Sequence, residues 1–283
     1  MKRPTATRIS TILLRVLIAV LAALAGVIAL MPERVRALIP KPEVEVFHVA
    51  ARARAIADES PGGRSLTDTY YVGRTASAHL HLIGKDSGCE LHLHEHTEEA
   101  SIPVTGRPLV TEVFARAGSR VTRTAGYDTG TLIVSRPNGA HAWRNPSHRE
   151  YQATLVVTLG GEFPGNDFVR PTDARILKAE EPLILDPKTD ERISGRDRGN
   201  RELVVPAAHA ALTVLALSEP RSVEPGGEAT LLYVVEGAGL FDAGKRSFRL
   251  GPTTLVVSRL THTARIVPDA ETRLVGYLVR TPR

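Results

Sequence analysis

The sequence is poor in the residues that most often build covalent or stacked sites. It holds one cysteine, two methionines and one tryptophan, and aromatic residues make up 5% of the chain. The single cysteine, Cys89, excludes an intramolecular disulfide and leaves no Cys-x-x-Cys pair for a zinc site. Its thiol is either a metal ligand or nucleophile, or a small half-buried side chain at the start of a strand, and the second interpretation is favoured.

Clusters of like charge are also missing. Lysine and arginine number 36 and aspartate and glutamate 31, giving a net charge of +5 that is spread thinly along the chain. Binding of nucleic acid needs a clustered basic patch, usually with stacking aromatic residues. We therefore expect no nucleic-acid partner. With 42% hydrophobic residues, the chain is able to bury a substantial core.

The N-terminus carries an apolar run behind a basic flank. Lys2, Arg3 and Arg8 precede the uncharged stretch from Val16 to Met31. A membrane-spanning helix needs about 20 residues and a signal-peptide core about 7–15, so this run falls between the two. We expect residues 1–35 to be a signal peptide or an uncleaved signal-anchor helix, with a slight preference for the anchor. The remainder would then be exported, either periplasmic or membrane-anchored and facing outside the cytoplasm. The alternative is a buried core helix.

From Tyr70 onward the sequence consists of short segments rich in β-branched residues. Turn residues separate segments such as "AHLHLIG", "PLVTEVF" and "ATLVVTLG", which is typical of an all-β sandwich or barrel. Residues 36–65 are interpreted as a linker and lead-in with a short helix over 48–59. Residues 162–201, rich in proline, glycine and charge, are interpreted as a connection between two units.

The pattern of the first unit recurs in the second. The segment "TLIVSR" at Thr131–Arg136 returns as "TLVVSR" at Thr254–Arg259. Likewise "IPVTG", which ends at Gly106, resembles "YVVEG", which ends at Gly237. Landmarks in the same order in both halves indicate two copies of one β-unit.

A histidine cluster lies in the first unit. His92, His94 and His96 occupy alternate positions of "ELHLHEH", so in a strand they share one face. Glu99 is an odd number of positions further on and joins that face only if the chain turns near residues 96–98. Two imidazoles and a carboxylate from adjacent strands suit a divalent metal. His141 follows a proline–glycine turn, and only a closed barrel would bring it near the others.

These residues resemble the motifs of the cupin family of double-stranded β-helix, or jelly-roll, barrels. The first cupin motif, H-x-H, three or four residues, E, six residues, G, fits from His92 to Gly106 at every spacing, although its leading glycine is displaced around Asp86. The second motif, G, five residues, P-x-G, two residues, H, three residues, N, fits from Gly130 to Asn145 with one shift in each of two gaps. The resemblance is clear over residues 66–160 and degenerate over 202–281.

The resemblance implies a bicupin: an N-terminal hydrophobic helix followed by two jelly-roll barrels. The first barrel would comprise residues 66–161 and the second, a degenerate copy, residues 202–283. The implied metal ligands are His92, His94, Glu99 and His141, and the implied cofactor is one divalent transition metal ion: Fe, Mn, Zn, Ni or Cu. The alternative is that these four are surface or structural residues.

Further residues of the first unit are candidates to line the pocket or to support the ligands. They are His96, His79, His81, Asn145 and Trp143. For His96 solvent exposure is an equal alternative, His79 and His81 lie on one face of an earlier segment, and for Trp143 core packing is favoured.

The second copy departs from the metal pattern. Counting back from Gly237, Thr230 occupies the position of Glu99, and Val223 and Pro225 occupy those of His92 and His94. His262 is taken as the counterpart of His141 but has no partners. We expect this copy to be metal-free.

Two classes of function remain open. The first is a metal-dependent, dioxygenase-like enzyme that acts on a small organic molecule. The second is a non-catalytic periplasmic or membrane-tethered protein that binds a ligand or the metal itself. Expected partners are a small molecule, the membrane if the N-terminal helix is retained, and a second copy in a homodimer. No spacing identifies a proton-transfer pair, which argues against epimerase and isomerase chemistry.

Overall fold

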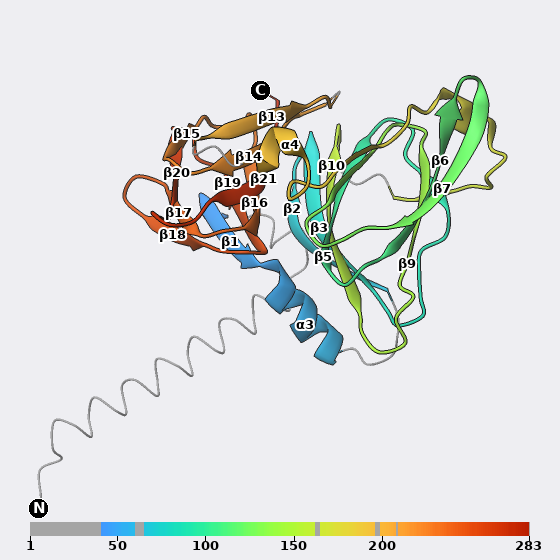
Figure 1. The fold of residues 1–283 in the computed structure, drawn as a ribbon, viewed down its shortest axis with the longest axis horizontal. Coiled ribbons are helices and arrows are strands. Elements are labelled where there is room, and N and C mark those ends of the chain that lie inside the picture. The colour runs from blue at the N-terminus through green and yellow to red at the C-terminus, as the bar shows by residue number, and fades with distance from the viewer. Residues whose placement is uncertain (1–40, 60–64, 162–164, 196–198, 208, 283) are drawn as a thin grey trace, which may run out of the picture. The chain divides into compact units, whose positions relative to one another are not determined.

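The computed structural model describes residues 41–59, 65–161, 165–195, 199–207 and 209–282 (Figure 1). The expected signal segment, residues 1–35, lies outside the described residues. Within the described part of the chain, no helix is long and apolar enough to cross a bilayer. From Glu43 onward the chain forms one compact unit.

This unit is nearly all-β, as the short β-branched segments predicted. The first half builds two sheets, which we call the first central sheet and the first outer sheet. In spatial order the first central sheet contains β12 (Leu183–Leu185), β8 (Leu132–Ser135), β5 (Glu98–Thr105), β10 (Gln152–Leu159), β3 (Ala76–Ile83) and β2 (Leu66–Val72). The first outer sheet contains β11 (Asp167–Phe168), β4 (His92–Leu93), β9 (Ala140–Arg144), β6 (Leu109–Arg116) and β7 (Ser119–Gly126).

The second half also builds two sheets, the second central sheet and the second outer sheet. The second central sheet contains β1 (Val44–His48), β19 (Thr254–Ser258), β16 (Thr230–Glu236), β21 (Leu274–Arg280), β14 (Ala211–Leu217) and β13 (Arg201–Val205). The second outer sheet contains β15 (Arg221–Val223), β20 (Ala264–Pro268), β17 (Gly239–Asp242) and β18 (Ser247–Leu250). The described helices are short: α3 (Val49–Glu59), the 3-10 helix η1 (Ala174–Lys178) and α4 (Glu191–Ser194).

The main core lies between the two central sheets. Because side chains alternate along a strand, each central sheet presents one apolar face to the other. From the first half this core includes Leu80, Ile102 and Leu155, and from the second Leu231 and Tyr277. Burial of so many aliphatic side chains is the dominant favourable contribution to the association of the two halves.

Polar contacts also link the halves. Arg136 donates to the carboxylate of Glu98 at 2.6 Å and to the backbone oxygen of Pro206 at 2.7 Å. The hydroxyl of Tyr277 donates to the backbone oxygen of Gly130 at 2.5 Å. The bonds from Arg136 to Pro206 and from Tyr277 to Gly130 thus join the two halves directly.

The two segments that recur in the sequence occupy corresponding places in the central sheets. "TLIVSR" supplies β8 and "TLVVSR" supplies β19. Gly106 and Gly237 follow β5 and β16 with φ angles of 71° and 81°, a left-handed conformation that glycine adopts without steric cost. Glu99 pairs with Ser135, and Thr230 pairs with Ser258, so the registers correspond as well.

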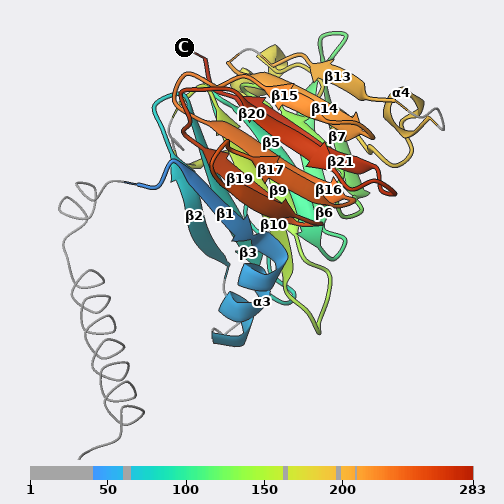
Figure 2. The ribbon, with the colours of Figure 1, turned by 90° about the vertical axis from the view of Figure 1, so that its left-hand side faces the viewer.

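Two stretches expected to be connections instead contribute strands. Within residues 36–65, β1 pairs with β19 and thereby joins the sheet of the far half of the chain, where it lies among the red strands in both views (Figure 1, Figure 2). Within residues 162–201, β11 pairs with β4 and β12 pairs with β8. These additions cover the backbone groups of sheet edges that would otherwise be open to pairing with another molecule.

Candidate metal centre

Strand pairing brings the sequence-predicted ligands together from both sheets of the first half. His92 on β4 lies directly opposite His141 on β9 in the first outer sheet. Glu99 lies on β5 of the first central sheet, and His94 lies in the turn between β4 and β5. The chain therefore turns between His94 and Glu98, as the odd spacing to Glu99 required.

The four side chains form one buried cluster. One ligand atom from each of His92, His94, Glu99 and His141 lies within 4.8 Å of the other three. His94 Nε2 is 3.2 Å from Glu99 Oε2, and His141 Nε2 is 3.3 Å from Glu99 Oε1. Each of the four residues is at most 4% exposed. Opposite ligands at metal distances of about 2.0–2.2 Å are about 4.4 Å apart, so the spacing is close to that of a bound ion.

The protonation of Glu99 and His92 suits coordination. Burial raises the pKa of Glu99, but the neighbouring His141 and His94 outweigh it and hold that pKa well below the usual range, so the carboxyl is ionised. Burial, reinforced by His141, lowers the pKa of His92 to about 4, so its imidazole is neutral near pH 7. A carboxylate and a neutral imidazole are the forms that bind divalent metals.

Neighbouring groups orient two of the ligands. His92 Nδ1 lies 2.8 Å from the backbone oxygen of Glu90. Because a carbonyl oxygen only accepts, Nδ1 carries the proton and Nε2 keeps the lone pair that a metal needs. Ser101, two residues along the same face of β5, donates its hydroxyl to Glu99 Oε1 at 2.7 Å.

His141 supplies a direct test of whether the cluster fits a metal. Burial lowers its pKa, yet the adjacent Glu99 carboxylate outweighs this and raises it above the ordinary value. Its Nε2 is buried and faces Glu99, but it forms no hydrogen bond of acceptable geometry with the described residues. The raised pKa places a proton on His141 beside the Glu99 carboxylate, and a metal ion bound among the four side chains would replace that proton. The cluster therefore fits a divalent transition metal ion.

The other predicted pocket residues are placed differently from one another. His79 and His81 lie on β3, on the same face as the cluster, and burial lowers the pKa of His79 to about 4 and also lowers that of His81. His96 lies outside the cluster: its side chain is 89% exposed and 3.7 Å from Glu95. The turn that carries Glu99 to the neighbouring sheet directs His96 to solvent.

Three further residues of the first unit contact the protein framework and not the cluster: Asn145, Trp143 and Cys89. Asn145 donates to the backbone oxygens of Ile83, Gly84 and Glu150, and so joins the end of β3 to the segment before β10. Trp143 packs in an apolar cluster, as the favoured interpretation had it. Burial raises the pKa of the Cys89 thiol to about 11, and its sulfur accepts from the Trp143 backbone N–H. A protonated thiol in this position is neither ligand nor nucleophile.

Another buried carboxylate inside the first barrel, Glu112, was not predicted from the sequence. Glu112 on β6 lies opposite His141 and is 2% exposed. Its Oε2 accepts from Arg123 at 2.8 and 3.1 Å and from the Tyr127 hydroxyl at 3.1 Å. Only strand register reveals this group, because "PLVTEVFAR" contains no motif that marks its glutamate as internal.

The second half contains no comparable set of metal ligands among its described residues. Val223 on β15 is buried in an apolar cluster, and it pairs with Ala264 on β20. Since His92 pairs with His141 in the same way, the counterpart of His141 is Ala264. The assignment of that role to His262 was therefore wrong, and His262 is exposed in the turn before β20.

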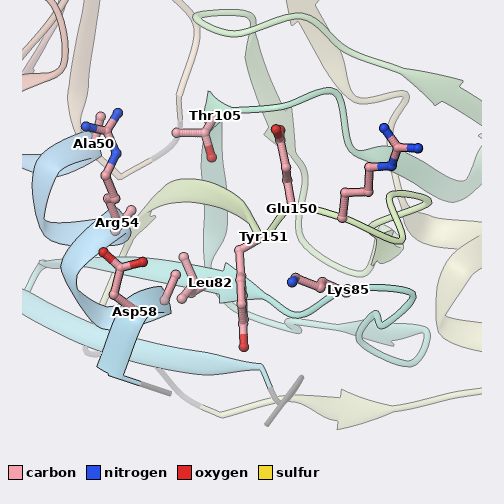
Figure 3. A pocket seen from close by; sticks show the side chains of 11 residues that line it. Ala50, Arg54, Asp58, Leu82, Lys85, Thr105, Glu150 and Tyr151 are labelled. Atoms are coloured by element: carbon pink, nitrogen blue, oxygen red, sulfur yellow. The ribbon is translucent and has the colours of Figure 1, made fainter. Parts of the chain in front are cut away.

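A separate cavity of about 540 Å³ lies between α3 and the first central sheet (Figure 3). Alanines of α3 and Leu82 form part of its lining, and side chains of both charge signs surround it, among them Arg54, Asp58 and Lys85. None of the four cluster residues lines it. Its mixed charge identifies no ligand class.

No protein-family model matches the sequence, and no curated protein matches it. Solved structures do match. Salicylate 1,2-dioxygenase from Pseudaminobacter salicylatoxidans is 13% identical, with a TM-score of 0.60 over 89% of this chain and 86% of the other. A variant of the dioxygenase in complex with gentisate is 13% identical, with a TM-score of 0.59 over 99% and 92%. A mutant oxalate decarboxylase of Bacillus subtilis is 12% identical, with a TM-score of 0.51 over 77% and 73%.

Identities this low establish the fold and leave the chemistry to the site. The sheet order, the glycine turns and the histidine–glutamate cluster agree with the motifs in the sequence. The chain therefore has the jelly-roll fold of the cupins, with a buried cluster that fits a divalent metal ion.

Proposed function

We propose that this protein is a metal-dependent cupin that acts on a small organic molecule in the manner of a dioxygenase. The observation that carries the proposal is the buried cluster of His92, His94, Glu99 and His141. The four residues are its metal ligands in this proposal. A divalent transition ion bound there would supply Lewis-acid and redox chemistry to a molecule beside it.

The chain's own residues prepare that chemistry. The Glu90 backbone oxygen fixes the tautomer of His92, and Ser101 holds the Glu99 carboxylate in place. Burial of all four ligands excludes bulk water, which strengthens electrostatic interactions inside the barrel. The dioxygenase structures with the same fold support this reaction class, one of them in complex with gentisate.

Metal analysis of protein purified without added metal is the first test. We expect one divalent ion per chain, and we expect His94→Ala to lose stoichiometric metal while the protein stays folded. His96→Ala is the matched control, because His96 is two residues away and exposed. Retention of metal by His94→Ala, or equal loss in both variants, would contradict the ligand assignment.

An oxygen-uptake screen of the metal-loaded protein against small organic acids, phenols and polyols tests the activity. Uptake that depends on both the added compound and His94 supports the enzyme. The alternative is a non-catalytic protein that binds a ligand or the metal. It predicts bound metal with no substrate-dependent uptake.

We further propose that the second half is a degenerate cupin repeat, so that the chain is a metal-binding and a metal-free barrel joined as a bicupin. The corresponding registers of β5–β8 and β16–β19 support this. The basic flank and apolar run at the N-terminus support export, with the barrels outside the cytoplasm. A reporter fused after Arg283 should be active outside the cytoplasm, and a cytoplasmic reporter would overturn the targeting proposal.

A further inference from the structure

The inner face of the first central sheet is lined by small polar side chains. Strand register places Ser77, Thr158, Glu99 and Ser135 in one row across β3, β10, β5 and β8. Four residues from Thr158 along β10, on the same face, Thr154 lies beside His81. The ligand Glu99 is thus a member of a polar wall that extends over several strands.

Many polar atoms of this wall are buried without a hydrogen-bond partner among the described residues. They are Ser77 Oγ, Thr154 Oγ1, Thr158 Oγ1 and, on the same face of β10, Gln152 Oε1. Their residues are between 0 and 4% exposed. Nearly all buried polar atoms in folded proteins are hydrogen-bonded, so several unpaired atoms on one surface indicate bound water or a bound polar ligand.

The first outer sheet also contributes a buried oxygen without a hydrogen-bond partner in the described part of the chain, Glu112 Oε1. Glu112 uses Oε2 for Arg123 and Tyr127, while its Oε1 is buried and has no partner among the described residues. An ionised carboxylate oxygen only accepts, so its missing partner is a donor. Arg123, the cation beside it, is already engaged with Glu112 and with Glu181 at 3.1 Å.

A hydroxyl-rich molecule meets these requirements. A hydroxyl donates and accepts, so it pairs with serine and threonine hydroxyls and also donates to Glu112. An ionised acid without hydroxyls, such as oxalate, offers acceptors alone and would bring a further negative charge close to Glu112.

We propose that the first barrel binds a polyhydroxylated small molecule of the polyol or sugar class beside the metal cluster, with Ser77, Thr154, Thr158 and Glu112 Oε1 as its hydrogen-bond partners. This assignment of substrate class rests on the proposed function for the position of the ligand. Its hydrogen-bonding groups are independent of the metal chemistry.

The test is calorimetric titration of the full chain with myo-inositol and glucose as probes, and with oxalate and salicylate as comparators. Because both acids chelate divalent metal ions, the titrations are made on metal-loaded and on metal-free protein, and the comparison of affinities is taken from the metal-free protein. We expect at least one of the two polyhydroxylated probes to bind at least about tenfold more tightly than either acid, because each additional buried hydrogen bond contributes about a factor of ten. Tighter binding of the acids, or no binding of either polyhydroxylated probe at millimolar concentration, overturns the proposal.

Thr154→Val and Thr158→Val remove a hydroxyl and preserve shape. Each should weaken binding of the polyhydroxylated probe about tenfold, with metal content unchanged. Since the lost hydroxyls lack a protein partner, the melting temperature of the unliganded variants should stay the same or rise, whereas a merely structural hydroxyl would lower it. Thr213→Val, at a buried inner position of the second half, is the control and should change neither measurement. Unchanged affinity in both β10 variants overturns the proposal.

Metal content and oxygen uptake are measured on the same preparations. Failure of the proposed function shows as absent metal or absent substrate-dependent uptake, whereas failure of this inference shows as loss of the polyol preference.

Discussion

The interiors of the two halves differ although their strands correspond. In the first half the row across the central sheet is Ser77, Thr158, Glu99 and Ser135. In the second half the corresponding row is Ala211, Arg280, Thr230 and Ser258. In the next row His79, Val156, Ser101 and Ile133 are replaced by Thr213, Leu278, Leu232 and Val256.

The second interior is closed by apolar packing. Leu215, Leu232, Phe241, Ile266 and Leu278 belong to one buried cluster between its two sheets. The first interior instead has unpaired hydroxyls and ionisable groups. The same jelly-roll fold therefore accepts either an apolar or a polar interior, because the backbone hydrogen bonds of the sheets and the apolar faces between the central sheets stabilise it in both halves. Chemistry then depends on which side chains point inward.

Removing the second half should have the largest effect. Deletion of residues 202–283 exposes the apolar face of the first central sheet and leaves β1 without its partner β19. We expect insoluble or aggregated protein, measured by size-exclusion chromatography of the soluble fraction. As the control, His262→Ala in the full chain should leave both solubility and metal content unchanged. A monomeric, metal-loaded fragment of residues 66–165 would contradict the dependence of one half on the other.

Creating a cavity in the apolar interior of the second half should have the next largest effect on stability. Phe241 is 1% exposed, so Phe241→Ala should lower the free energy of unfolding by about 3–5 kcal/mol. Ser135→Ala in the polar interior of the first half should change it by less than about 1 kcal/mol. Urea titration measures both. A larger cost for Ser135→Ala than for Phe241→Ala would contradict the view that apolar packing stabilises the second interior and not the first.

Removing the hydrogen bond that orients the ligand Glu99 should have a smaller effect, on metal affinity in the first half alone. Ser101→Ala removes the hydroxyl that holds Glu99, and we expect metal affinity to fall about 10–100-fold, as for other groups that orient metal ligands. Competition with a chelator of known affinity measures the change. The control is Leu232→Ala at the corresponding position, which should lower stability but leave metal affinity intact. Equal metal affinity in Ser101→Ala and the wild type would argue against this role.

The pH dependence of the metal-free protein should be the smallest effect. Burial lowers the pKa of His79 and of His92 from 6.5 to about 4, so between these values the unfolded chain binds more protons than the folded one. Stability is therefore complete above about pH 6.5 and is lost as the pH falls toward 4. The two lowered pKa values alone correspond to a loss of about 4 kcal/mol at pH 5, and the raised pKa of His141 offsets part of it. We therefore expect a net loss of about 1–2 kcal/mol, measured by urea unfolding at pH 7 and pH 5.

A variant separates this effect from general acid sensitivity. His79→Gln should reduce the loss between pH 7 and pH 5, whereas His96→Gln, at an exposed position, should leave it unchanged. An identical pH dependence in both variants and the wild type would show that other groups control acid stability.

The fold class was predictable from the pattern of the residues, and the metal cluster from their resemblance to the cupin motifs. Alternating hydrophobic residues with regular turns specify β-sheet, because side chains point to opposite faces at every second residue. The fixed spacings from His92 to Glu99 and from Glu99 to Gly106 specify a turn and a strand of set length. These spacings and the second motif around His141 resemble the cupin motifs, and that resemblance predicted which four residues meet.

The pairing of distant strands became known from the three-dimensional structure. It placed β1 in the sheet of the far half and made Ala264, rather than His262, the counterpart of His141. It also turned Glu112 inward beside His141 and turned His96 to solvent. The physical reason is that facing and register are set by hydrogen bonds to a partner strand far away in the sequence, and a shift of one residue reverses every side chain.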